Sequence, residues 1–95
     1  MPLFVLTCID KTDALEARMG ARPAHLEYVD ANLSLVKLAG PFLDEAGGMV
    51  GSMFILETQD QAAAESFAAQ DPYALAGVFE RTEVRAFKVV RGALG

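Results

Sequence analysis

The stretch from residue 49 to residue 58, MVGSMFILET, says most about the fold of this chain. Aliphatic and aromatic side chains crowd it, which is typical of a β-strand. Its residues 53–56 (MFIL) are apolar at successive positions, whereas a strand with one solvent-exposed face alternates apolar with polar side chains. Residues 4–6 (FVL), within the similar stretch 2–9, break the alternation in the same way. We therefore expect two strands in a sheet that is covered on both faces.

Between these strands, residues 14–32 are dense in helix-forming residues and predict a helix. Thr12 or Asp13 can cap its start, with Glu16 placed as in a capping box. Pro23 has no backbone N–H to donate and is predicted to kink the helix or restart it.

The remaining turn residues and helix breakers complete the predicted order of helices and strands. We expect a strand over 33–39 closed by Gly40 and Pro41, a loop over 44–48, the strand over 49–58, a helix from 59–60 to 70 that Asp71 and Pro72 break or recap, and a strand over 82–90. The order β-α-β-β-α-β predicts an α+β, ferredoxin-like fold with a four-stranded antiparallel sheet and both helices on one face. We expect residues 1–95 to form a single domain.

The composition indicates that this domain pairs with a second copy of itself. With 95 residues, of which 53% are hydrophobic, the chain has more apolar side chains than one thin core can hide. The helices can cover only one face of the sheet, so we expect a homodimer through the other face. The alternative is a monomer in which the long loop shields that face.

The charge balance excludes one large class of partners. A formal net charge of -5 argues against nucleic acid, because phosphate binding needs clustered Lys and Arg. A sheet that reads RNA would also need a basic and aromatic strand motif, which is missing. The apolar run over 3–9 is too short for a membrane span and has no basic region before it, so we expect a cytoplasmic protein.

The cysteine and histidine content argues against a metal centre. Cys8 is the single cysteine, so it cannot form an intrachain disulfide. We expect it to be a small, buried apolar residue of a protein in a reducing compartment. A reactive thiol is the alternative. One cysteine and one histidine do not supply the three or four ligands of an ordinary zinc site, so we expect no metal. We also expect no organic cofactor.

His25 is the only histidine, and its unperturbed pKa of about 6.5 suits it to giving and taking protons near neutrality. Helical spacing places it, with Arg18, at the margin of an apolar stripe, and Arg22 close by. The stripe consists of Leu15, Met19, Leu26 and Leu33. A pocket wall would lie at that margin. In the alternative interpretation His25 is a partly buried structural residue, and the two arginines are solvated surface charges paired with Asp13, Glu16 or Asp30.

Several other residues can contribute to such a pocket. Asp71, followed by Pro72, can start a short helix and can also orient an imidazole with its second carboxylate oxygen. Gly40-Pro41 and Gly51-Ser52 are expected at strand ends, where backbone amides can bind an anionic oxygen, although turn geometry alone explains them. Tyr73 and Tyr28 can donate a phenolic proton or simply pack.

Four fragments in this order resemble the YCII-related family: Arg22-Pro-Ala-His-Leu26, Ala39-Gly-Pro41, Gly51-Ser52 and Asp71-Pro-Tyr-Ala-Leu-Ala-Gly-Val-Phe79. The resemblance runs over nearly the whole chain. It implies a dimeric ferredoxin-like α/β barrel, similar in build to muconolactone isomerases, with an active site at His25 and Asp71. Relatives linked to a pathway look like lyases, isomerases or dehalogenases that act on ring-cleavage or aromatic-derived acids.

Two functional hypotheses follow. In the first the chain is an acid–base enzyme for a small organic acid or lactone, with His25 and Asp71 catalytic and with Arg22, Gly40, Pro41, Ser52 and Tyr73 binding an anionic substrate. In the second the same pocket belongs to a non-catalytic module that binds a small ligand.

Overall fold

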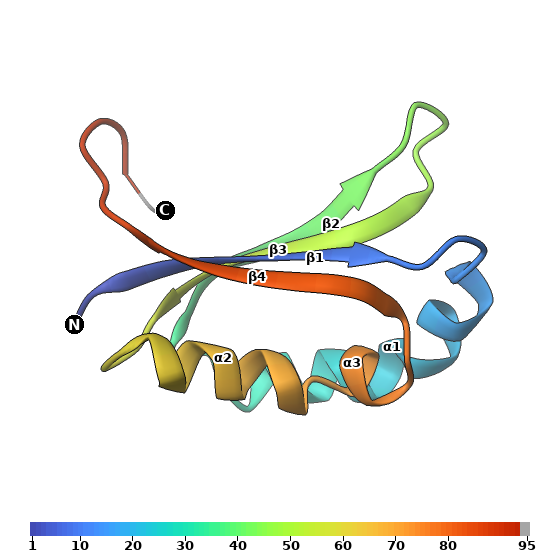
Figure 1. Ribbon diagram of the computed structural model, residues 1–95, viewed down its shortest axis with the longest axis horizontal. Coiled ribbons are helices and arrows are strands. Elements are labelled where there is room, and N and C mark those ends of the chain that lie inside the picture. The colour runs from blue at the N-terminus through green and yellow to red at the C-terminus, as the bar shows by residue number, and fades with distance from the viewer. Residues whose placement is uncertain (94–95) are drawn as a thin grey trace.

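The computed structural model describes residues 1–93 and shows one sheet with its helices packed on one side (Figure 1). In chain order the elements are β1 (Leu3–Asp10), α1 (Leu15–Asp30), β2 (Val36–Leu43), β3 (Met49–Glu57), α2 (Gln61–Gln70), α3 (Pro72–Leu75) and β4 (Phe79–Phe87). The predicted order of elements is confirmed, with the one-turn helix α3 added after α2.

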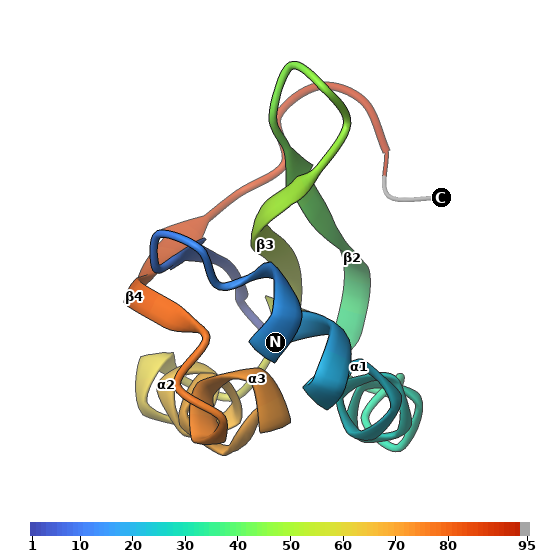
Figure 2. The same cartoon turned by 90° about the vertical axis from the view of Figure 1, so that its right-hand side faces the viewer.

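The sheet is antiparallel and has the strand order β2-β3-β1-β4. The two strands with continuous apolar runs, β1 and β3, occupy its centre, where Leu6 of β1 faces Phe54 on one side and Val84 on the other. All three helices lie under one face (Figures 1 and 2). The α+β, ferredoxin-like architecture expected from the sequence is therefore present.

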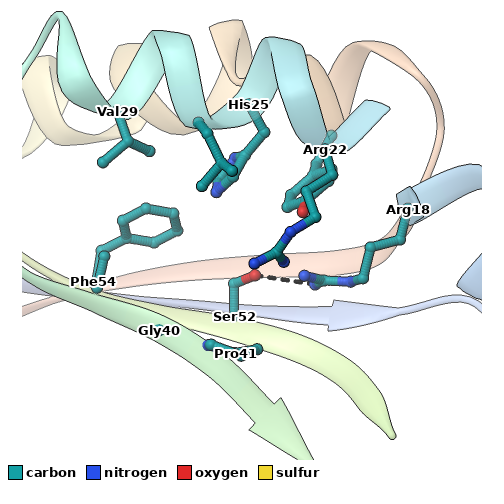
Figure 3. A pocket seen from close by; sticks show the side chains of 11 residues that line it. Arg18, Arg22, His25, Val29, Gly40, Pro41, Ser52 and Phe54 are labelled. Atoms are coloured by element: carbon teal, nitrogen blue, oxygen red, sulfur yellow. Dashed lines mark hydrogen bonds between the residues drawn. The ribbon is translucent and has the colours of Figure 1, made fainter. Parts of the chain in front are cut away.

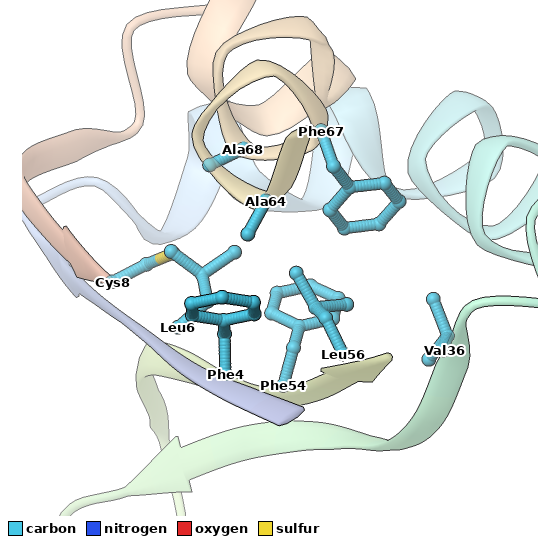
Figure 4. Close-up of a cluster of buried hydrophobic side chains, with 9 residues drawn as sticks. All are labelled: Phe4, Leu6, Cys8, Val36, Phe54, Leu56, Ala64, Phe67 and Ala68. Atoms are coloured by element: carbon cyan, nitrogen blue, oxygen red, sulfur yellow. The ribbon is translucent and has the colours of Figure 1, made fainter. Parts of the chain in front are cut away.

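The core lies between the sheet and α2. Alternate residues of the central strands point toward the helices, and each fully buried Leu or Phe contributes about 1.5–3 kcal/mol of transfer free energy. The buried cluster consists of Phe4, Leu6, Cys8, Val36, Phe54, Leu56, Ala64, Phe67 and Ala68 (Figure 4). Cys8 is a free, buried thiol in this cluster, as its sequence context indicates.

The face of the sheet away from the helices carries the strand side chains that alternate with the core residues. On β1 and β3 it presents mainly Val5, Ile9, Met53 and Ile55, as the pairing of Val5 with Ile55 requires. The chain after β4 and the β2–β3 hairpin both rise on this side of the sheet, away from the helices (Figure 1). The central strands are thus apolar on both faces, as residues 4–6 and 53–56 predict.

Strands β2 and β4 are displaced from the ranges that the sequence predicts. Strand β2 begins at Val36 instead of residue 33, because the turn after α1 continues and the amide of Val36 donates to the carbonyl of Asn32. Consequently Gly40 and Pro41 lie inside β2 and do not close it. Proline is tolerated there because β2 is an edge strand, so one side of it needs no ladder donor.

Strand β4 likewise begins at Phe79, three residues before the predicted position, and ends at Phe87. The strand starts early because Val78, the residue before it, is already bonded to the chain after β1: the amide of Lys11 donates to the carbonyl of Val78. This bond brings Phe79 opposite Asp10 at the end of β1.

Helix α1 also departs from the prediction at its start. Ala14 occupies the N-cap position and no side chain caps the helix, so the predicted capping by Thr12 or Asp13 with Glu16 is wrong. Asp13 has a φ of 59°, in the left-handed region, which turns the chain just before the helix. Pro23 lies inside the helix without dividing it.

Among the described residues, no helix is both long enough and apolar enough to cross a membrane.

Candidate active site

His25 and Asp71, 46 positions apart in the chain, meet beneath the sheet. The Nδ1 atom of His25, on α1, lies 2.8 Å from Oδ1 of Asp71, and both side chains are buried. Asp71 is fixed by its place in the chain: it ends α2, caps α3 and accepts a hydrogen bond of 2.9 Å from the amide of Tyr73. The structure therefore brings together the two residues that the sequence singles out.

This contact determines which nitrogen of the imidazole is free. An ionised carboxylate can only accept hydrogen bonds, so Nδ1 of His25 carries the proton that it shares with Asp71. The lone pair of a neutral His25 then resides on Nε2. The side chain of His25 reaches from α1 into the space between helix and sheet (Figure 3), so Nε2 is the atom suited to take a proton.

Tyr73 forms a wall behind the imidazole. Its ring lies parallel to that of His25, with the centroids 3.9 Å apart and an interplanar angle of 15°. Phe54 meets the imidazole edge-on, at a centroid distance of 6.1 Å. These contacts hold the imidazole plane, while Oδ2 of Asp71 and the phenolic oxygen of Tyr73 are buried with no hydrogen-bond partner among the described residues.

Helix α1 does not present the face that its apolar stripe predicts. Leu15, Met19 and Leu26 are each about half exposed, whereas Arg18 and His25 are its buried residues. The inner face of the helix therefore carries the polar residues 18, 22 and 25, which are spaced i, i+4 and i+7. Tertiary context decides this, because Arg18 and His25 lie over Ser52 and Asp71, which supply their hydrogen-bond partners.

Arg18 is buried and ion-paired, so its interpretation as a solvated surface charge is wrong. Its Nε and Nη2 atoms donate to the two carboxylate oxygens of Asp10 at 2.8 and 2.9 Å, and Nη2 also donates to Oγ of Ser52 at 2.9 Å. Burial disfavours the charged guanidinium, but the hydrogen bonds and charge of Asp10 outweigh this and raise the pKa of Arg18. Its charge is locally neutralised.

Arg22 has no carboxylate partner in the part of the chain that the structure describes. It is half-buried, and its Nη1 atom lies 3.4 Å from the sulfur of Met49, a weak acceptor. The predicted pairing of either arginine with Asp13, Glu16 or Asp30 does not occur within residues 1–93. Arg22 therefore offers the cavity a positive charge that no acidic neighbour cancels.

These residues surround a cavity of about 230 Å³ between α1, β2 and β3 (Figure 3). Its walls are mixed, with charged and hydroxyl groups at one end and apolar groups at the other. The lining consists of Arg18, Arg22, His25, Leu26, Val29, Ala39, Gly40, Pro41, Ser52, Phe54 and Tyr73. All of the predicted substrate-binding positions line it, and Asp71 stands behind His25.

Gly51 and Ser52 lie within β3, not at a free strand end as expected. Gly51 faces Ile9 on one side and Phe42 on the other, so both neighbouring strands pair with this segment. A Cβ atom at Gly51 would lie 2.5 Å from the carbonyl oxygen of Cys8, so glycine is required for the strands to approach. The side chain of Ser52 is the polar group that this segment presents to the cavity.

The sequence places Arg18 at the margin of the pocket but assigns it no part in the site. Its spacing from Arg22 and His25 is a usable signal, because residues at i, i+4 and i+7 share one face of a helix. Its carboxylate partner, however, comes from the end of β1, which only the folded chain brings near.

The described residues contain no group of three or more His, Cys, Asp or Glu side chains that could hold a metal ion.

Comparisons with known proteins agree with this architecture. The YCII-related domain family matches residues 2–88. The protein YciI of Escherichia coli O6:H1 is 39% identical over 96 aligned positions, which cover 93% of this chain and 98% of that protein. An uncharacterized protein of Haemophilus influenzae is 33% identical and covers 92% and 97% of the two chains.

Solved structures extend the similarity to three dimensions. The 5-chloro-2-hydroxyhydroquinone dehydrochlorinase of Burkholderia phenoliruptrix, in complex with 2,5-dihydroxybenzoquinone, superposes with a TM-score of 0.83 at 30% identity, covering 90% of this chain and 93% of its own. An antibiotic biosynthesis monooxygenase gives a TM-score of 0.57 at 18% identity, covering 96% and 100%, which shows the fold alone. The fold is that of the dimeric α/β barrel superfamily.

Proposed function

Since this chain belongs to the YCII-related domain family, we propose that it is an acid–base enzyme for a small organic acid, lactone or hydroxylated ring, working without a metal or an organic cofactor. The observation that carries the proposal is the 2.8 Å contact between His25 Nδ1 and Asp71 Oδ1 at the wall of a cavity. The reaction class is that of a lyase, an isomerase or a dehalogenase.

His25 is the general base in this proposal. Its Nε2 atom takes a proton from an oxygen, or from a carbon next to a carbonyl, while Asp71 holds the tautomer and stabilises the imidazolium that forms. The substrate then expels a leaving group or is reprotonated at another carbon by the same imidazolium. Proton transfer of this kind typically contributes about 10²–10⁴ in rate.

The size and polarity of the cavity support a small anionic substrate. A volume of about 230 Å³ lies below the range of about 300–1,000 Å³ that is usual for drug-sized ligands, so a single ring or a short acid fits. Arg22 supplies a positive charge, Ser52 a hydroxyl, and Gly40 and Pro41 a close backbone wall on β2. The dehalogenating relative acts on a ring compound of this size, which favours the same substrate class here.

Assays with matched variants test the proposal. Wild type, His25→Gln, Asp71→Asn and Asp60→Asn are incubated with 5-chloro-2-hydroxyhydroquinone and with a panel of small lactones and hydroxy acids. Asp60 is the control, because it also caps a helix by accepting from a backbone amide but lies away from the cavity. We expect turnover by wild type and Asp60→Asn, and a loss of about 10²–10⁴ in the other two variants.

Equal turnover by wild type and His25→Gln would remove the imidazole from the mechanism. The alternative function, a non-catalytic module, is favoured instead if a compound raises the melting temperature of wild type and is recovered chemically intact after long incubation.

We also propose that the protein is a homodimer joined through the outer face of the sheet. Val5 and Met53 are partly exposed on this face, beside the buried Ile55, and give it an apolar centre that no helix covers. Membership of a superfamily of dimeric barrels supports the same arrangement. We place the dimer in the cytoplasm, in keeping with its free cysteine, and cell fractionation checks this.

A further inference from the structure

Arg18 contacts three parts of the candidate site, although its charge is already neutralised. It is 1% exposed, and its guanidinium is held by both carboxylate oxygens of Asp10. A buried ion pair alone rarely adds to stability, because the desolvation of both groups offsets their attraction. Its further contacts, to Ser52 and Tyr73, are therefore the ones that bear on function.

The contact with Ser52 fixes the role of the hydroxyl group. Arginine has only donors, so in the 2.9 Å bond from Nη2 the oxygen of Ser52 must accept. The hydroxyl hydrogen is then free for another acceptor, and among residues 1–93 the structure shows no hydrogen bond that Ser52 donates through its side chain. Ser52 is buried and lines the cavity, so its hydrogen is available to an acceptor atom of a ligand.

The contact with Tyr73 extends to the imidazole. The guanidinium carbon lies 4.4 Å from the centre of the Tyr73 ring, and the His25 ring stacks on the same ring at 3.9 Å. One face of a phenol has no room for both planar groups at these distances, so Tyr73 is held between them. A cation over an aromatic face is attracted by the ring, so the contact with Arg18 fixes the position of the Tyr73 ring on which His25 stacks.

We propose that Arg18 is a positioning residue that fixes the Ser52 hydroxyl as a hydrogen-bond donor into the cavity and fixes the Tyr73 ring on which His25 stacks. Arg18 would thus act on a substrate oxygen through Ser52, while Asp10 anchors the guanidinium from the end of β1. This deepens the proposed function, on which it rests, because it requires a ligand with an acceptor oxygen beside the imidazole.

The first test needs no ligand. Three-bond couplings between Hα and Hβ of Ser52, measured by NMR, report whether its side chain keeps one rotamer. We expect one rotamer in wild type and in the control Arg91→Lys, an identical substitution at an exposed position, and averaged couplings in Arg18→Lys. If Arg18→Lys does not fold, Asp10→Asn takes its place, because it releases the guanidinium. The couplings of Ser52 are expected to be averaged in that variant as well. A single Ser52 rotamer in the folded variant would overturn the proposal.

The second test asks whether Arg18 acts through Ser52. Affinity for 2,5-dihydroxybenzoquinone is measured for wild type, Arg18→Lys, Ser52→Ala and the double variant, with Ser52→Thr as the variant that restores the hydroxyl. Each single change is expected to weaken binding about tenfold, and the double change also about tenfold, because both remove the same hydrogen bond. Ser52→Thr is expected to bind within about threefold of wild type.

A hundredfold loss in the double variant, or an unchanged affinity in Arg18→Lys, would contradict the role of Arg18. A wild-type protein that does not bind the quinone counts against the proposed substrate class instead, and the rotamer measurement then decides the role of Arg18 by itself.

Discussion

At the scale of single residues, the core and the candidate site meet at Cys8. This thiol is 1% exposed, belongs to the apolar cluster, and has its pKa raised from 9.0 to about 12, first by burial and then by the negative charge of Asp71. A thiol with so high a pKa is protonated at neutral pH and is a poor nucleophile. Cys8 is therefore a structural residue here, and the alternative of a reactive thiol loses its support.

The raised pKa of Cys8 predicts a loss of stability at alkaline pH. Because the unfolded thiol ionises near pH 9 and the folded one only near 12, folding is increasingly disfavoured above pH 9. The difference in free energy of unfolding between wild type and Cys8→Ala should fall by about 1.4 kcal/mol from pH 8 to pH 10. Urea unfolding of both proteins measures this. Free energies of unfolding that change equally with pH in the two proteins would contradict this prediction.

At the scale of elements, the close approach of β1 and β3 depends on one glycine. Gly51 leaves room for the carbonyl oxygen of Cys8, whereas a Cβ atom there would meet it at 2.5 Å. Gly40, on the neighbouring strand β2, has no heavy atom within 4 Å of such a position. The two glycines thus offer a matched pair for measuring how tightly the strands pack.

Alanine should therefore destabilise the protein at only one of these positions. We expect Gly51→Ala to lower the free energy of unfolding by about 1–3 kcal/mol, because the backbone of β1 cannot yield as a side chain could. Gly40→Ala should change it by no more than about 0.5 kcal/mol. Denaturant unfolding of both variants checks this, and equal effects would show that the strands adjust freely.

At the scale of the whole molecule, the sheet has helices on one face only (Figure 2). By the strand register, its other face is apolar along β1 and β3. Val5 lies near the middle of this face, opposite Ile55 on β3 and Arg85 on β4. A charge placed there would have to be buried if a second copy packs on the face.

The dimer proposal therefore predicts that Val5→Lys is monomeric. Sedimentation velocity should give a dimer for wild type and a monomer for the variant, whose helical content by circular dichroism stays that of wild type. Leu15→Lys, on the half-exposed outer side of α1, is the control and should leave the dimer intact. A Val5→Lys protein that sediments as wild type does would place the interface elsewhere.

The sequence by itself determined the order of the elements, the apolar character of β1 and β3 on both faces, and the chain positions His25 and Asp71. These follow from local signals: side-chain periodicity, turn residues and a proline at the start of α3 act over a few residues. Strand β2 was misplaced because the turn at Asn32 extends to Val36. The tolerance for Pro41 inside the strand depends on which strand lies at the edge of the sheet.

Only the tertiary structure decided which face of α1 turns inward. The apolar residues Leu15 and Met19 predicted the wrong face, because buried partners for Arg18 and His25 come from Asp10, Ser52 and Asp71, which are distant in the chain. A buried charge is stable only where hydrogen-bond partners compensate its lost hydration, and the positions of those partners are a property of the folded chain.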